Sequence, residues 1–250
     1  MSGCVSTDRI LSKLDEYLHK DDYVSAERHL VYWLDESSRA KDGRTELLVC
    51  NELMGLYRKL GRRDEAIGCA ERALSLISAR GIEEQVGAAT TYLNAATVYK
   101  AFDRAADGIG LFEHAKSIYE RELSPDDTRL SGLYNNMGLA LVDLGRFREA
   151  EECYEKAVSI LQKSETGAPE IAITYLNMAS AAEAEKGLED AAETIEALLA
   201  RAEALLEDYP TRDGYYAFVC EKCATVFDYY GHFFYANELK RRARRIYEGN

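Results

Sequence analysis

The sequence predicts an all-α solenoid built from about six helix-turn-helix repeats. Two of the observations behind this prediction are periodic. Tyr92, Tyr134 and Tyr175 stand 42 and 41 residues apart, and each is followed two positions later by Asn. A short turn recurs at a similar interval, and self-similarity with a period of 20 to 50 residues is typical of solenoids. The third observation is that only three prolines occur in 250 residues, which favours long helices.

The recurring turn joins the two helices of each repeat. Its positions are separated by 40, 42, 42, 41 and 45 residues, and they are Asp21, Gly61, Asp103, Gly145, Lys186 and Gly231. Five residues after each turn position stands Ala or Gly, where a small side chain lets two helices approach closely. We therefore expect a single domain, 1–250, whose repeats cover approximately 7–43, 44–87, 88–130, 131–170, 171–212 and 213–250.

The three prolines are consistent with this division of the chain. Pro125, Pro169 and Pro210 each fall between expected repeats, where a helix should stop.

The most regular copy is NNMGLALVDLGRFREAEECYEKAVSI, residues 135–160. It contains a Met-Gly pair, a Gly turn and small and aromatic residues at set positions, namely Met137, Gly138, Gly145, Ala150, Tyr154 and Ala157. These residues resemble the tetratricopeptide repeat family, and the resemblance covers essentially the whole chain. A spacing near 42 instead of the common one of about 34 is similar to the long repeats of kinesin light chains and Leu-Gly-Asn-repeat scaffolds. The resemblance implies a right-handed superhelix whose first helices line a concave groove for a peptide or protein ligand.

The Tyr-x-Asn pattern assigns opposite roles to its two residues. Successive helical residues are about 100° apart, so Tyr92 and Asn94 point to nearly opposite sides. Tyr92 begins a stripe at i, i+3, i+4 and i+7 that a helix buries. The resemblance implies that the other side lines the groove, where Asn94, Asn136 and Asn177 form a ladder whose amides bind a ligand backbone. The alternative is that each Asn bridges neighbouring helices or is solvated.

Charged residues flank this ladder. Glu52 and Lys222 replace Asn in the second and sixth copies. The predicted peptide-binding groove consists of Arg58, Asn94, Thr97, Lys100, Asn135, Asn136, Asn177, Glu183 and Lys222. The charged residues on this face form a gradient, which favours a peptide with one acidic and one basic end. The second and third copies contribute Arg58, Lys59 and Lys100, and the fourth to sixth copies contribute Asp143, Glu183, Glu221 and Asp228. The alternative is a solvated face of mixed charge.

No catalytic, metal or cofactor site is predicted. Cys220 and Cys223 have CxxC spacing, which redox enzymes and zinc sites use, but they lie on the stripe expected to be buried and no second CxxC accompanies them. We interpret the cysteines as small core residues, and an enzyme that uses the CxxC remains an alternative. The four histidines occupy different repeat positions, and no phosphate-binding loop is present.

The negative net charge of the chain limits the kinds of molecule that it is expected to bind. A net charge of −13 disfavours nucleic acids and anionic membranes. The basic stretch KRRARR at 240–245 is interpreted as the solvated outer side of the last helix, with nucleic-acid binding as the alternative. The N-terminus does not resemble a signal peptide and no run of eighteen apolar residues occurs, so we expect a cytoplasmic protein.

The segment 215–239 is unusually aromatic. Phe218, Tyr229, Phe233, Phe234 and Tyr235 exceed what one buried stripe needs. We interpret them as a heavier core in the closing repeat, and a partner or dimer surface is the alternative. The sequence thus predicts a non-enzymatic scaffold, monomeric or homodimeric, that binds a protein or peptide. A peptide sensor that sequesters another protein and a homodimeric scaffold remain alternatives.

Overall fold

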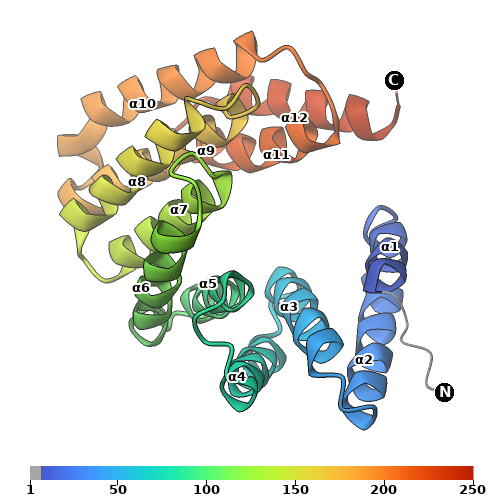
Figure 1. Ribbon diagram of the computed structural model, residues 1–250. Helices are drawn as coiled ribbons and strands as arrows, with labels where there is room; N and C mark the ends of the chain where they lie inside the picture. The colour runs from blue at the N-terminus through green and yellow to red at the C-terminus, as the bar shows by residue number, and fades with distance from the viewer. Residues whose placement is uncertain (1–6, 250) are drawn as a thin grey trace. The chain divides into compact units, whose positions relative to one another are not determined.

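The computed structural model describes residues 7–249 and contains only α-helices over that range (Figure 1). This confirms the prediction of an all-α helical repeat fold. The chain divides into two compact units, Met1–Glu122 and Leu123–Asn250. Within the described part of the chain, no helix is long and apolar enough to cross a membrane.

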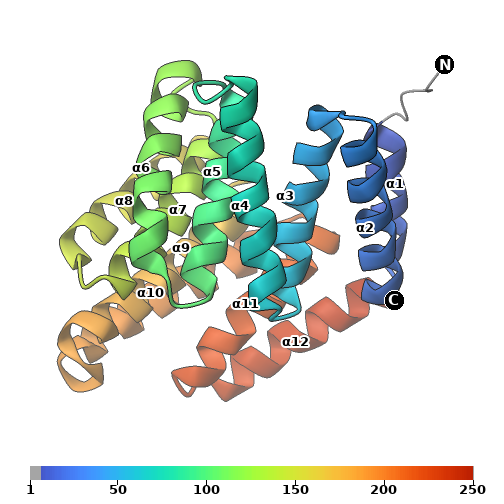
Figure 2. The ribbon, with the colours of Figure 1, turned by 90° about the horizontal axis from the view of Figure 1, so that it is seen from below.

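The first unit contains three helical hairpins. Its helices are α1 (Thr7–Leu18), α2 (Tyr23–Arg39), α3 (Gly43–Lys59), α4 (Arg63–Arg80), α5 (Val86–Ala101) and α6 (Ala105–Glu122). Consecutive helices pair as α1/α2, α3/α4 and α5/α6, and the first helices α3 and α5 also pack on each other. Figure 2 shows α4, α5 and α6 running alongside one another.

The second unit repeats this arrangement with three further hairpins. Its helices are α7 (Thr128–Asp143), α8 (Phe147–Leu161), α9 (Ala168–Lys186), α10 (Leu188–Asp208), α11 (Gly214–Tyr229) and α12 (Phe233–Tyr247). The first helices α7, α9 and α11 pack in series, with α9 in the middle. Their sides away from α8, α10 and α12 therefore form one continuous surface.

The turn within each hairpin contains a residue in the left-handed conformation. Asp21, Gly61, Asp103, Gly145 and Gly231 have φ between 51° and 85°, as the repeat spacing predicts. The fifth turn differs, because Lys186 is the last residue of α9 and the left-handed residue is Gly187, at φ 82°. The prediction of Lys186 was wrong by one residue, since a residue without Cβ adopts this conformation without steric cost.

The periodic tyrosines belong to the core, as predicted. Tyr92, Tyr134 and Tyr175 are at most 6% exposed. The small residues after each turn allow close helix approach, and Gly138, before the turn at Gly145, permits another close contact. A Cβ on Gly138 would lie 2.6 Å from the Tyr154 ring, so this ring packs directly on the α7 backbone.

Candidate functional site

The outer surface of α7, α9 and α11 carries three residues of one repeat position, Asn136, Asn177 and Lys222. The two asparagines are half-buried and Lys222 is exposed. We call this surface the α7–α9–α11 face. In the first unit, the corresponding α3–α5 face carries Glu52 and Asn94, both half-buried.

On the α3–α5 face, asparagine side chains join the two helices. The Asn51 Nδ2 group donates to the Thr91 hydroxyl at 3.0 Å and to the Leu47 carbonyl oxygen at 2.9 Å. The Asn94 Nδ2 group donates to Asn51 Oδ1 at 2.8 Å. Asn94 therefore bridges neighbouring helices, which is the alternative role that the sequence left open, and retains its own carbonyl oxygen and one N–H for other partners.

The second unit contains the same pattern with one bond missing. The Asn135 Nδ2 group donates to the Thr174 hydroxyl at 2.9 Å, as Asn51 does to Thr91. However, Asn135 Oδ1 is buried and accepts no hydrogen bond from the residues that the structure describes. Asn177 is the repeat counterpart of Asn94, yet its amide makes no hydrogen bond to any described residue. The hydrogen bond between the two asparagines is therefore formed in the first unit and not formed in the second.

Sequence reasoning placed Asn135 in the groove but missed its partner Thr174 and the pair Asn51 and Thr91. Asn51 and Asn135 share one repeat position, two repeats apart, and so do Thr91 and Thr174. A repeat alignment extended by one position would have identified them as inter-helix partners.

The other predicted groove residues have different surroundings. Asn136 donates to the Gly132 carbonyl oxygen of its own helix at 2.8 Å, and the Thr97 hydroxyl donates to the Leu93 carbonyl oxygen at 2.8 Å. On the first unit, Arg58 is exposed and Lys100 is half-buried.

Two predicted groove residues contact the aromatic side chains of the last hairpin. Glu183 accepts hydrogen bonds from the Tyr229 and Tyr230 hydroxyls at 2.7 and 2.8 Å. The ammonium group of Lys222 lies over the Phe218 ring, 5.6 Å from its centroid.

Glu52 is the one acidic residue at the ladder position. Its burial, with a smaller contribution from the Asp15 carboxylate, raises the pKa of the Glu52 carboxyl group. A half-buried carboxyl group of this kind is less readily ionised than one in water.

The aromatic segment of the last hairpin is largely exposed. Phe218, Tyr229, Phe233 and Phe234 are 45%, 69%, 59% and 97% exposed, so the heavier-core interpretation is wrong for these four residues. The helical period already assigns the buried side of α11 to other residues, which are Tyr216, Val219, Cys220, Cys223 and Phe227. Tyr235 alone fits the interpretation, because it is half-buried and meets the Phe227 ring edge-on at 4.8 Å.

The basic stretch of α12 is only partly solvated. Arg241, Arg244 and Arg245 are exposed as predicted. Arg242 instead pairs with both carboxylate oxygens of Glu207 at 2.7 and 3.0 Å and thereby ties α12 to α10. The solvated-cap interpretation is therefore wrong for Arg242.

The cysteines are buried free thiols, as expected of core residues. This holds for Cys50, Cys69, Cys153, Cys220 and Cys223, while Cys4 lies outside the described residues. Burial raises the pKa of the thiols in the CxxC pair, which opposes thiolate chemistry. Residues 7–249 contain no cluster of His, Cys, Asp and Glu able to hold a metal ion.

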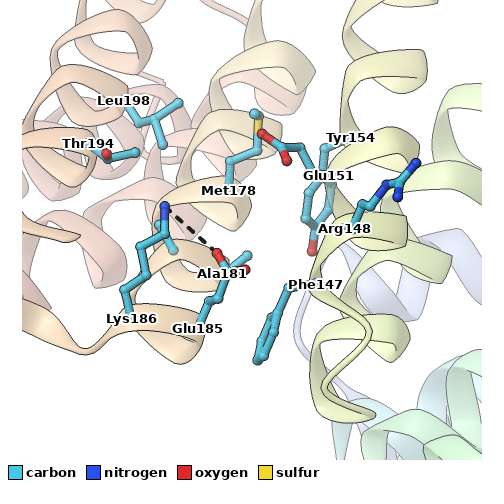
Figure 3. Close-up of a pocket in the computed structure, with 11 residues that line it drawn as sticks. Phe147, Arg148, Glu151, Tyr154, Met178, Ala181, Glu185, Lys186, Thr194 and Leu198 are labelled. Atoms are coloured by element: carbon cyan, nitrogen blue, oxygen red, sulfur yellow. Dashed lines mark ion pairs between the residues drawn. The ribbon is translucent and has the colours of Figure 1, made fainter. Parts of the chain in front are cut away.

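A cavity of about 150 Å³ lies in the second unit, among α8, α9 and α10. Met178 and Ala181 of α9 face Phe147 and Tyr154 of α8 across it (Figure 3). The Tyr154 hydroxyl is buried and has no hydrogen-bond partner among the described residues.

Comparisons with known proteins agree with this geometry. Paired helices packed in series are typical of helical-repeat proteins. Residues 49–84 and 87–163 match family models described as Tetratricopeptide repeat. The two matched stretches are therefore tetratricopeptide repeats, and the chain is similar to long-repeat proteins of the kinesin light chain type.

A curated relative shares part of the sequence. Protein KINESIN LIGHT CHAIN-RELATED 2 of Arabidopsis thaliana is 29% identical over 156 residues, which are 58% of this chain and 22% of the relative. The chain therefore spans about a fifth of that relative's length.

Solved structures share the fold at low sequence identity. BtubC (BKLC) from P. vanneervenii has a TM-score of 0.68 and 22% identity, with 82% of each chain covered. A putative kinesin light chain of Podosopora anserina has a TM-score of 0.55 and 19% identity, over 80% of this chain and 94% of the other. A Rap protein complexed with Competence and Sporulation Factor has a TM-score of 0.57 and 14% identity, over 100% of this chain and 77% of the other.

Proposed function

We propose that this protein is a non-enzymatic scaffold that binds an extended peptide, or an extended segment of another protein, along the exposed face of its first helices. The amides of Asn94, Asn136 and Asn177 hold the ligand backbone. Flanking side chains select among sequences, and these are Arg58, Thr97, Lys100, Asn135, Glu183 and Lys222. The six repeats act together as one domain in the cytoplasm.

The observation that carries this proposal is the state of Asn177. Its amide is half-buried on the α7–α9–α11 face and has no hydrogen-bond partner in the part of the chain that the structure describes. Its counterpart Asn94 shows how the position is satisfied when a partner is present, since it donates to Asn51 Oδ1 at 2.8 Å. A peptide carbonyl offers Asn177 the same kind of acceptor, and a peptide N–H can donate to its Oδ1.

The helical scaffold supports such binding by being preformed. Asn177 lies in the middle of α9, and the central helix α9 packs against both α7 and α11. A rigid surface lowers the ordering cost of association. The Rap structure of similar fold was solved in complex with a partner, which supports a ligand-binding use of the fold.

The experiment is selection from a displayed library of random decapeptides, followed by affinity measurement with the selected peptides. We expect the wild-type chain to select binders and Asn136→Ala/Asn177→Ala to bind them roughly 10- to 100-fold more weakly, because about two hydrogen bonds of about 0.5–1.5 kcal/mol each are lost. Asn237→Ala, at an exposed position of α12, is the matched control and should bind as the wild type does.

Two results would count against the proposal. A library that yields no binder contradicts peptide binding itself. Equal affinities for the wild type and the double variant, with both shown to be folded by circular dichroism, contradict the role of the asparagine amides.

A further inference from the structure

Two tyrosine–carboxylate pairs join α9 and α11. The Tyr215 hydroxyl donates to Glu170 at 2.7 Å, and the Tyr229 hydroxyl donates to Glu183 at 2.7 Å. Burial and the bond to Glu170 raise the pKa of Tyr215, so its hydroxyl remains a donor at neutral pH. The two rings are 42% and 69% exposed. Each pair therefore presents an open aromatic ring beside an oriented carboxylate.

Elsewhere the chain combines such a pair with an arginine. In the first unit, the Tyr57 hydroxyl donates to Glu27 Oε1 at 3.2 Å, and the Arg62 guanidinium donates to the same oxygen. The guanidinium also lies over the Tyr57 ring, 4.8 Å from its centroid. One arginine thus pairs with the carboxylate and stacks on the phenol at the same time.

A second arginine in the other unit is held in a related way. The Arg242 guanidinium pairs with Glu207 through two hydrogen bonds and lies 6.0 Å from the centroid of the Tyr235 ring. It also donates to the Tyr216 hydroxyl at 3.2 Å. The combination of tyrosine, carboxylate and guanidinium therefore recurs among residues 7–249.

The pairs on α9 and α11 lack the third component. Among residues 7–249, no lysine or arginine lies over the Tyr215 or Tyr229 ring or forms an ion pair with Glu170 or Glu183. The adjacent Phe218 ring, stacked on Tyr215 with centroids 6.5 Å apart, already attracts the ammonium group of Lys222. The surface is thus aromatic, exposed and rich in carboxylates.

We infer that the α9–α11 part of the face binds arginine side chains of the partner peptide, one at Tyr215–Glu170 and one at Tyr229–Glu183. This inference rests on the proposed function and names the chemistry of its ligand. Each guanidinium stacks on the exposed ring and pairs with the carboxylate that the tyrosine hydroxyl orients. Arginine fits better than lysine, because its planar fork stacks and donates two hydrogen bonds together. The net charge of −13 attracts such a ligand from a distance.

The test uses peptides selected from the random decapeptide library. We expect arginine to be enriched among them. The strongest arginine-containing peptide is then compared with its citrulline analogue, which keeps the shape and loses the charge. The wild-type chain should bind the citrulline analogue at least 10-fold more weakly at low salt, and an arginine-to-lysine analogue should lie in between.

Variants locate the effect on this face. Glu170→Gln/Glu183→Gln should reduce the discrimination between the arginine peptide and its citrulline analogue to less than about 3-fold. Glu193→Gln, which changes an exposed carboxylate of α10, is the matched control and should leave the discrimination unchanged. Phe and Tyr rings remain in all these variants, so the carboxylates alone are tested.

The outcomes separate this inference from the proposed function. Selected peptides without arginine enrichment, or equal binding of the arginine and citrulline peptides, overturn the inference. If those peptides still bind the Asn136→Ala/Asn177→Ala variant more weakly than the wild type, the proposed function stands although the arginine inference fails. Discrimination that survives Glu170→Gln/Glu183→Gln also overturns the assignment to this face, whereas a library without binders contradicts both proposals.

Discussion

Tyr154→Phe should stabilise the protein by about 1–2 kcal/mol. The Tyr154 side chain is fully buried, and its hydroxyl finds no partner in residues 7–249. Burying a hydroxyl without a hydrogen bond costs about 1–3 kcal/mol in proteins. Phenylalanine keeps the ring that packs on Gly138 and leaves an extra void of only about 10 Å³, which costs roughly 0.2 kcal/mol at about 24 cal/mol per Å³.

Urea unfolding followed by circular dichroism measures this change. The midpoint should rise at constant m-value, and the melting temperature should rise by about 2–8 °C, since 1 kcal/mol corresponds to about 2–4 °C in a chain of this size. Tyr119→Phe is the matched control, because the equally buried Tyr119 hydroxyl is hydrogen-bonded to Thr90 at 2.7 Å. It should lose about 1 kcal/mol. A loss of stability in Tyr154→Phe would refute the reasoning and show that the hydroxyl is hydrogen-bonded, for example to water in the adjoining cavity.

Three further predictions concern stability. Gly138→Ala should cost about 1–3 kcal/mol in urea unfolding, because its Cβ would meet a buried ring, whereas Gly132→Ala, where no atom lies within 4 Å of the added Cβ, should be neutral or slightly stabilising. Glu52→Gln should raise stability at pH 7 by up to about 1 kcal/mol. Burial raises the folded-state pKa of this carboxyl group, so the stability that its protonated form contributes at low pH is lost as pH rises through the raised pKa. The stability gained from Gln should therefore vanish in a pH series towards pH 4. A gain independent of pH would contradict this reasoning. Arg242→Ala should cost about 1–3 kcal/mol and speed amide hydrogen exchange in α12, because Glu207 loses its bidentate partner; unchanged exchange would show that this ion pair does not hold the helix.

The spacing of turns and buried stripes was predictable because both depend on local geometry. A left-handed turn residue and a 3.6-residue period leave regular marks in the sequence, and the structure differs from the predicted turns only at Lys186. The exposed Phe218 was predictable by the same reasoning. It stands four residues before Lys222, one helical turn away on the exposed side, and its aromatic character alone suggested the core.

The hydrogen-bond partners of the asparagines could not be predicted in this way. Whether Asn94 forms a hydrogen bond depends on the residue that the neighbouring helix presents. Between α5 and α3 this residue is Asn51. Between α7 and α9 an asparagine stands at the same position, yet Asn177 donates no hydrogen bond to Asn135 Oδ1. A sequence period fixes which side a residue occupies, whereas the distance between two side chains depends on how two helices pack.

The same limit explains why identical residue types serve different purposes in the two units. Tyr57 and Tyr215 each donate a hydrogen bond to a glutamate of a preceding repeat. Arg62 completes the first of these pairs because it follows its own tyrosine by five residues, at the turn of the same hairpin. Tyr215 stands at the opposite end of its helix, where no such turn follows, and the nearby Arg212 lies over the Tyr216 ring instead, 4.3 Å from its centroid. For Tyr57 and Tyr215, the position along the helix thus separates a structural use of this residue combination from one open to a ligand.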